Sequence, residues 1–251
     1  MGEINKERAK GRIMKKIAIS LVTLFWMSVF AVGSASAAGI GFGGALHYVD
    51  IDASGSESSD TTGSETDSST VKAAVANTAY IGSYYLELTL GENDGFAFGY
   101  ESIPGSADVT DKTHTRTDTE TSVTSTAAQT SNSRAFKAAA EVEDFKVLYA
   151  EMPLGQLFYV RAGMSEITVN TKETASGNGG SYGNATLDGM QYGIGIKGVK
   201  GDKLRWKLGY EVNDFDSLSL TSSGNSVTAE TNKLTADLDT KALKIGLGIQ
   251  F

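Results

Sequence analysis

The chain has 251 residues, a formal net charge of −8, 29 glycines, two prolines and no cysteine. This length accommodates one large or two small domains. Without cysteine, neither a disulfide framework nor lipoprotein processing is possible. The acidic balance argues against nucleic-acid binding, because phosphate backbones attract basic surfaces.

The first 37 residues have the layout of a secretory signal peptide. Lys15 and Lys16 precede an apolar run, 17–32, and the small residues Ala35-Ser36-Ala37 form a cleavage motif before Ala38. An uncleaved anchor is disfavoured, since a spanning helix prefers about 20 apolar residues and this run is shorter. The residues before Met14 do not belong to a signal peptide, which predicts that translation starts at Met14. Cleavage leaves 16 of the 22 basic and 28 of the 30 acidic side chains, a net charge of −12.

From residue 38 onward the apolar residues recur with a period of two, which indicates strands rather than helices. Eight strands are predicted, at 39–49, 79–90, 96–101, 134–151, 158–164, 190–197, 204–212 and 243–251. One face of these strands is aromatic and aliphatic, and the other holds glycine and charge. Within 134–151 the apolar parity changes, which predicts a β-bulge near Glu143–Asp144 because one extra residue reverses the faces.

The connections alternate between long and short. The turns 91–95, 152–156 and 200–203 are brief, whereas 52–72, 104–134, 168–185 and 214–231 are long and polar. This alternation is typical of transmembrane barrels with short periplasmic turns and long extracellular loops. A ten-stranded barrel is the alternative if residues 104–134 form a hairpin within the membrane. This alternative is disfavoured, because lipid-facing charges there would cost about 2–4 kcal/mol at the midplane.

The two faces of the strands predict which side meets lipid. The interior of an eight-stranded barrel is narrow and just filled by side chains. We therefore assign the aromatic face to lipid and the glycines and charges to the lumen, with closure satisfying every backbone group. The predicted fold is all-β: an eight-stranded antiparallel up-and-down transmembrane β-barrel over residues 38–251, preceded by a signal peptide over 1–37.

These features together resemble the small outer-membrane barrels of the opacity and adhesin-like family. The resemblance implies an integral outer-membrane location in a Gram-negative bacterium, with the loops extracellular. It also implies that alternate residues of the C-terminal strand form the signal read by the barrel-assembly machinery, namely Leu243, Ile245, Leu247, Ile249 and Phe251.

Charged residues on the glycine-rich face predict an ion network in the lumen: Glu87, Glu101, Arg161, Lys197, Arg205, Lys207 and Glu211, with Lys146 and Lys244 as further cations. Such a network either closes the barrel or lines a selective pore. We favour closure, because the bore of eight strands is nearly filled.

The other candidate sites are weaker. Some eight-stranded outer-membrane barrels that this chain resembles modify lipid A with a His–Ser pair, but neither His47 nor His114 lies in an H-x-S arrangement. His47 is predicted to be a hydrogen-bonded lumen residue. The glycine-rich segments 41–44 and 193–198 precede no helix, so they are not phosphate-binding loops.

The long connections carry their own signals. Residues 52–70 predict a disordered, solvated loop. A divalent-cation site formed by the acids of this loop is the alternative, although their spacing lacks an EF-hand pattern. The acids in this loop are Asp52, Glu57, Asp60, Glu65 and Asp67. Threonine at every second position over 113–121 predicts a ribbon that projects beyond the bilayer. Its edge could recruit a partner strand, although its charges favour a solvated hairpin.

The sequence therefore predicts a monomeric, non-enzymatic outer-membrane barrel without cofactor or metal. Its expected role is structural or surface interaction through acidic Ser/Thr-rich loops. A small passive porin-like channel is the alternative, and a lipid-modifying enzyme comes third. The expected partners are membrane lipid, the barrel-assembly machinery and an unidentified surface ligand.

Overall fold

The computed structural model describes residues 38–60, 70–91, 95–109, 114–122, 130–175, 181–201, 203–223 and 231–251. The predicted signal peptide, 1–37, and the predicted start at Met14 lie outside these residues. Within the described ranges, no helix is long and apolar enough to cross a membrane.

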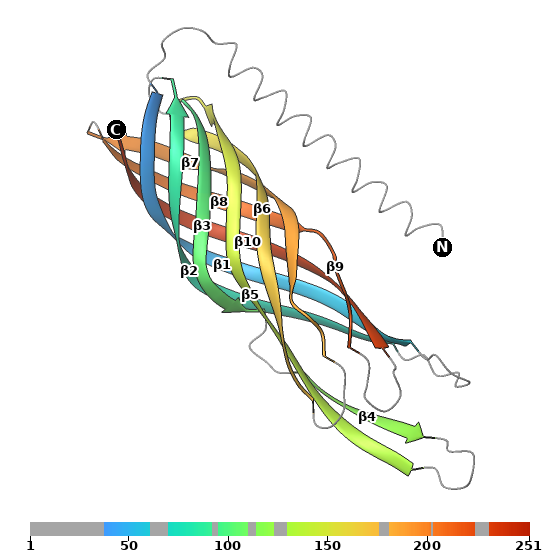
Figure 1. The fold of residues 1–251 in the computed structure, drawn as a ribbon. Coiled ribbons are helices and arrows are strands. Elements are labelled where there is room, and N and C mark those ends of the chain that lie inside the picture. The colour runs from blue at the N-terminus through green and yellow to red at the C-terminus, as the bar shows by residue number, and fades with distance from the viewer. Residues whose placement is uncertain are drawn as a thin grey trace, which may run out of the picture. The chain divides into compact units, whose positions relative to one another are not determined.

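Ten strands make up the fold (Figure 1). They are β1 (Ala38–Asp60), β2 (Thr70–Leu90), β3 (Phe96–Asp108), β4 (His114–Ser122), β5 (Thr130–Leu154), β6 (Phe158–Ala175), β7 (Ala185–Lys200), β8 (Leu204–Phe215), β9 (Leu218–Thr221) and β10 (Thr231–Gln250).

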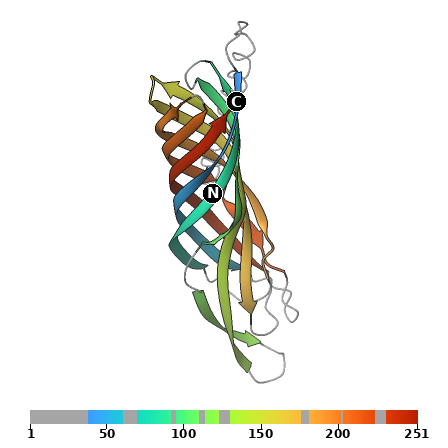
Figure 2. The same cartoon turned by 90° about the vertical axis from the view of Figure 1, so that its left-hand side faces the viewer.

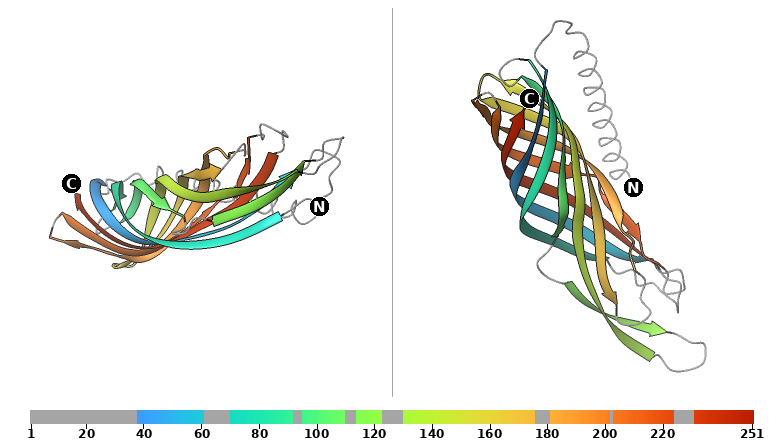
Figure 3. Two further views of the ribbon diagram at one scale, coloured as in Figure 1. Left: turned by 90° about the horizontal axis from the view of Figure 1, so that it is seen from below. Right: turned by 60° about the vertical axis from the view of Figure 1, so that its left-hand side comes forward.

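Eight of these strands form a closed antiparallel ring in the order β1-β2-β3-β5-β6-β7-β8-β10, with β10 pairing back to β1. Figures 2 and 3 show the same strands from three further directions. At the seam, the Phe251 amide donates to the Ile40 carbonyl at 2.9 Å, and the Ile40 amide donates to the Phe251 carbonyl at 3.1 Å. The predicted eight-stranded up-and-down barrel is confirmed.

The two remaining strands are extensions of the ring. β4 pairs with the outer part of β5, over Thr130–Ala138, and β9 pairs with β10. In Figures 1 and 2, β4 and this part of β5 project beyond the other strands. The ribbon predicted from the threonine repeat is therefore present, and it adds no strand to the ring.

The sequence analysis assigned some strand residues to the long loops. Residues 52–60 continue β1 and pair on both sides, with β2 and with β10, instead of forming a disordered loop. Gly and Asp, which occur in this segment, have low strand preference, but pairing on both edges overrides it. Among the acids named for this loop, Asp52, Glu57 and Asp60 lie in β1, whereas Glu65 and Asp67 lie outside the described residues.

The predicted bulge lies where the parity changes. The pairing of β5 with β6 shifts register between Glu143 and Lys146, and Asp144 has φ of 55°. The pairing of β3 with β5 shifts at the same height, between Ile103 and Ser106. The bulge lets Val142 and Val147, an odd number of residues apart, both point inward.

The exterior carries a continuous apolar band at the end of the barrel with the short turns. Its exposed residues run from Ile40 to Tyr48 on β1, and from Leu243 on β10 to Phe251 directly after it. These stretches match the roughly 9–11 residues that a tilted strand needs to cross a bilayer. The band ends in exposed tyrosines on five of the eight strands, as is typical of a membrane interface, and we call this set the tyrosine ring: Tyr48, Tyr80, Tyr100, Tyr192 and Tyr210.

Glycine on the inner face makes room for three buried tyrosines, Tyr85, Tyr149 and Tyr159. A Cβ at Gly99 would overlap the ring of Tyr149, and one at Gly195 would overlap the ring of Tyr159. The glycines of the lumen are thus fixed by close packing, not by backbone flexibility.

We predict that Gly99→Ala destabilises the barrel by about 1–3 kcal/mol, because the added methyl group cannot enter a filled interior. Gly82→Ala is the matched control, since Gly82 faces outward and its Cβ would meet only a carbonyl at 3.8 Å. Urea unfolding in lipid, followed by heat-modifiable gel mobility, measures both. Equal midpoints for the two variants would contradict this packing.

Candidate functional site in the barrel interior

The half of the barrel nearest the short turns encloses a network of four carboxylates and four cations from seven strands. Its members are Glu87, Glu101, Glu151, Glu211, Arg161, Lys197, Lys207 and Lys244, all at most 5 % exposed in their side chains. Each strand supplies them from the face opposite the lipid-facing residues. We call this set the inner ion network.

Arg161 is at the centre of the inner ion network. Its Nη2 donates to Glu101 Oε2 at 2.6 Å, and its Nη1 lies 3.0 Å from Glu211 Oε1 and 3.8 Å from Glu151 Oε1. The guanidinium carbon stacks 3.5 Å from the ring centroid of Tyr149. Lys244 completes this side, with Nζ 2.5 Å from Glu101 Oε2 and 3.3 Å from Glu211 Oε1.

Lys207 is the centre of a second group. It pairs with Glu87 and lies 2.8 Å from Glu151 Oε2, which Lys197 also approaches at 3.8 Å. The Tyr149 hydroxyl donates to Glu87 Oε1 at 2.6 Å and so links the two groups. Opposite charges are equal in number within the network, and each lies within 3.8 Å of an oppositely charged group.

The structure brings together six of the seven residues that the sequence nominated for the lumen. Arg205 lies two residues before Lys207 on the same face of β8 and is partly buried. Lys146, considered as a further cation, pairs instead with Glu166 at 3.4 Å near the surface. The assembly-signal residues of β10 all point outward, and Phe251 stacks on Phe42 with ring centroids 6.0 Å apart.

The sequence analysis did not nominate Glu151, which contacts three cations of the network. The signal was present, because Glu151 shares parity with Val147 and Tyr149 on β5. Those residues looked like a lipid-facing stripe, and their inward direction follows only from the pairing of β5 with β3 and β6.

His47 is buried in the lumen beside a serine and a carboxylate. Its Nε2 lies 2.8 Å from Ser83 Oγ and 3.2 Å from Glu101 Oε1, while Ser83 Oγ donates to Glu101 Oε1 at 2.6 Å. In a nucleophile–base–acid relay, the acid and the nucleophile contact different nitrogens of the imidazole. Here both contact the same nitrogen and the serine proton is directed to Glu101, so this geometry is that of a structural hydrogen-bond cluster.

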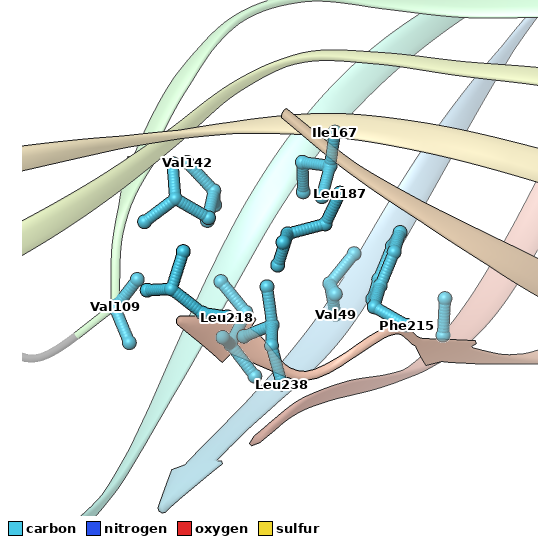
Figure 4. Packing of buried hydrophobic residues seen from close by; sticks show 11 residues of the cluster. Val49, Val109, Val142, Ile167, Leu187, Phe215, Leu218 and Leu238 are labelled. Atoms are coloured by element: carbon cyan, nitrogen blue, oxygen red, sulfur yellow. The ribbon is translucent and has the colours of Figure 1, made fainter. Parts of the chain in front are cut away.

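The outer half of the interior is apolar, contrary to the expectation of glycine and charge throughout the lumen. Val49, Val142, Ile167, Leu187 and Phe215 point toward one another from five strands (Figure 4). They occupy the same inward positions that carry charge nearer the turns. Outside the bilayer the exterior is hydrated, so the hydrophobic effect drives apolar side chains inward there. The charged lumen is thus confined to the membrane-spanning half.

The exterior beyond the tyrosine ring is acidic. Asp239 lies directly opposite Asp52 on β1 and Asp214 on β8. Partial burial, together with the charges of Asp214 and Asp237, raises the pKa of the Asp239 carboxyl above its ordinary value. Lys241 offsets part of this charge through its 3.0 Å contact with Asp52. Over the described ranges, no group of three or more His, Cys, Asp or Glu side chains is arranged to hold a metal ion.

The ring is closed and its apolar band matches the thickness of a bilayer. Aromatic residues lie at the margin of the band, and charge is enclosed inside the barrel. These features together identify the surroundings of the barrel. Lipid must surround it, because an exposed apolar belt of this extent is not stable in water. The chain has the fold of an integral outer-membrane β-barrel.

No family model matches the chain, and no curated protein matches it. Solved structures give three useful comparisons. OprG, an outer membrane protein from Pseudomonas aeruginosa, is 12% identical with a TM-score of 0.47, covering 87% of this chain and 98% of OprG. The protease OmpT from Escherichia coli is 8% identical with a TM-score of 0.42, covering 85% of this chain and 97% of OmpT. The attachment invasion locus protein Ail of Yersinia pestis, solved with a heparin analogue, is 11% identical with a TM-score of 0.35, covering 82% and 99%. The fold class follows from the barrel's own pairing and exterior.

We predict that Arg161→Leu destabilises the barrel by about 3–5 kcal/mol, because three buried carboxylates lose their shared partner. Lys146→Leu is the control, since its surface pair contributes at most about 1 kcal/mol. Urea midpoints of the refolded proteins in lipid measure both. A midpoint for Arg161→Leu close to that of the control would mean that the network does not stabilise the fold.

We predict that Asp239→Asn stabilises the barrel at pH 7 by about 0.2–1 kcal/mol, the range for relieving like charges directly opposite one another. A raised carboxyl pKa means that the folded state favours the protonated form, so lowering the pH relieves the same repulsion in the native protein. The advantage of the variant should therefore disappear at a pH below that pKa. Unfolding midpoints at pH 7 and at acidic pH test this, and a gain that persists in acid would contradict it.

Proposed function

We propose that this chain is a closed barrel in the outer membrane of a Gram-negative bacterium, and that it anchors strand extensions at the cell surface for interaction with surface partners. The inner ion network carries the proposal. Its four carboxylates and four cations pair across the bore with side chains at most 5 % exposed, so none of these eight charges is hydrated enough to line a conducting path.

Strand length supports the surface role. β1 has 23 residues and β5 has 25, roughly twice the 9–11 residues that a spanning strand needs. The outer parts are also tied together. The Tyr182 hydroxyl donates to Glu57 at 2.8 Å, and Ser181 and Ser223 form two hydrogen bonds. A rigid projecting wall presents a defined surface to a partner, as loops on rigid scaffolds do.

Planar-bilayer recording separates a closed barrel from the alternative, a small passive channel. We predict that the folded native protein gives no discrete openings, whereas the double variant Glu101→Ser/Arg161→Ser conducts because its central pair is gone. Heat-modifiable mobility must first establish that both proteins are folded. Steady openings of the native protein would overturn closure and make the inner ion network the lining of a pore.

The surface role has a separate test. Removing residues 110–132, which include β4, should leave membrane insertion and heat-modifiable mobility intact, because this ribbon lies outside the ring. Attachment of whole cells to host or abiotic surfaces should fall. Unchanged attachment by cells that display the shortened barrel would contradict this role.

A further inference from the structure

The apolar outer half of the interior contains a cavity of about 50 Å³. One water needs roughly 10–15 Å³ measured in this way, so the space exceeds a single solvent molecule. Its walls are mostly apolar and include Ile51, Ile103, Val142, Phe145 and Ile167. An apolar cavity of this kind takes up small apolar molecules more readily than water.

An interruption in the barrel wall accounts for the cavity. Among the described residues, pairing of β2 with β3 ends at Tyr84 and Ser102. Beyond that point β3 passes through Gly105, with φ of 99°, and pairs with β5 alone. Gly105, Ser106 and Ala107 therefore line the cavity from β3, with Ile81 facing them from β2. The β3 side chains at this point are small, and β3 is not paired with β2 there, so space remains between the two strands.

Two side-chain amides line the cavity, and among the described residues the nitrogen of each forms a hydrogen bond while the oxygen does not. Gln191 and Asn213 lie directly opposite each other on β7 and β8 and are 1% and 4% exposed. Gln191 Nε2 donates to Glu211 at 3.3 Å, and Asn213 Nδ2 donates to Thr240 at 2.9 Å. The carbonyl oxygens of both amides accept no hydrogen bond from the described residues. Buried acceptors of this kind are normally satisfied.

The orientation of Gln191 is set by its neighbour. Glu211 is a carboxylate held by Arg161 and Lys244, so it can only accept, and the amide nitrogen of Gln191 must face it. The carbonyl oxygen is then left for a donor that does not belong to the network. Paired acceptors beneath apolar walls select a molecule with an apolar body and a hydrogen-bond donor at one end.

We propose that this cavity is a binding site for a small neutral apolar compound that carries a hydroxyl group. The hydroxyl donates to the carbonyl oxygens of Gln191 or Asn213, and the hydrocarbon part contacts the walls formed by Val142, Phe145 and Ile167. Anions are excluded, because Glu143 and Glu211 also line the cavity. The site lies above the inner ion network and is independent of whether the barrel conducts.

Binding of 4-fluorophenol to the native protein in lipid nanodiscs, followed by its ¹⁹F signal, tests the proposal. Fluorobenzene has the same ring without the donor. We expect saturable binding of 4-fluorophenol and affinity at least about tenfold weaker for fluorobenzene, since one satisfied buried acceptor separates them. Empty nanodiscs give the partition into lipid, and a native signal that never exceeds it would overturn the site.

The double variant Gln191→Leu/Asn213→Leu should lose about tenfold in affinity for 4-fluorophenol and little for fluorobenzene. Asn170→Leu is the matched control, because Asn170 Oδ1 also accepts no hydrogen bond from the described residues but does not line the cavity. Ala107→Leu fills the cavity without changing the amides and should abolish binding of both compounds. It keeps the test decisive if the double variant fails to fold.

Three results would overturn the proposal: equal affinity for both compounds, binding that survives Ala107→Leu, or 4-fluorobenzylamine binding more tightly than 4-fluorophenol. The last would assign the cavity to cations instead of neutral hydroxyl compounds, through the carboxylates of Glu143 and Glu211.

Discussion

The solvent outside the barrel changes from lipid to water part-way along each strand, and the rest of the structure depends on that change. Inside the bilayer, the outward positions are apolar and the inward positions carry charge. Beyond the tyrosine ring, the same two faces exchange character. On β1, the inward face reads His47 and then Val49 and Ile51, while the outward face passes from Leu46 and Tyr48 to Asp50. The same hydrogen-bonded strands thus carry their apolar side chains on the outside within the bilayer and on the inside beyond it.

This exchange divides the interior into two compartments with different chemistry. In the inner compartment, low polarity outside and a narrow bore force every enclosed charge to find a partner, because an unpaired buried ion costs several kcal/mol. Equal numbers of carboxylates and cations meet that demand. In the outer compartment the hydrophobic effect acts as in any water-facing sheet. Gln191 and Asn213 lie at the boundary, where one amide group faces each kind of environment.

The network also explains the composition of the lumen. Tyr85, Tyr149 and Tyr159 fill the space around the ion pairs and offer ring faces to Arg161, Lys197, Lys207 and Lys244. Rings of that size fit an eight-stranded bore only where the neighbouring strand lacks a side chain, as at Gly99 and Gly195. Glycine, tyrosine and charge are therefore one packing arrangement. Replacing any one of them disturbs the other two.

The sequence by itself determined the eight-stranded ring, the lipid-facing side of every ring strand except β5, and the position of the bulge at Glu143–Asp144. These follow from a period of two, since side-chain direction alternates strictly along a strand. The sequence also nominated most of the lumen charges, because they share parity on neighbouring strands.

Only the tertiary structure decided where the strands end, which charges meet and what fills the outer half. Residues 52–60 looked like a loop because local preference for strand is weak there, and pairing with both β2 and β10 is a long-range effect. Glu151 joined the network only through the register that the bulge imposes across β5. The contact of His47 with Ser83 and the cavity beside Gly105 depend on how neighbouring strands are staggered, and stagger is set by closure of the whole ring.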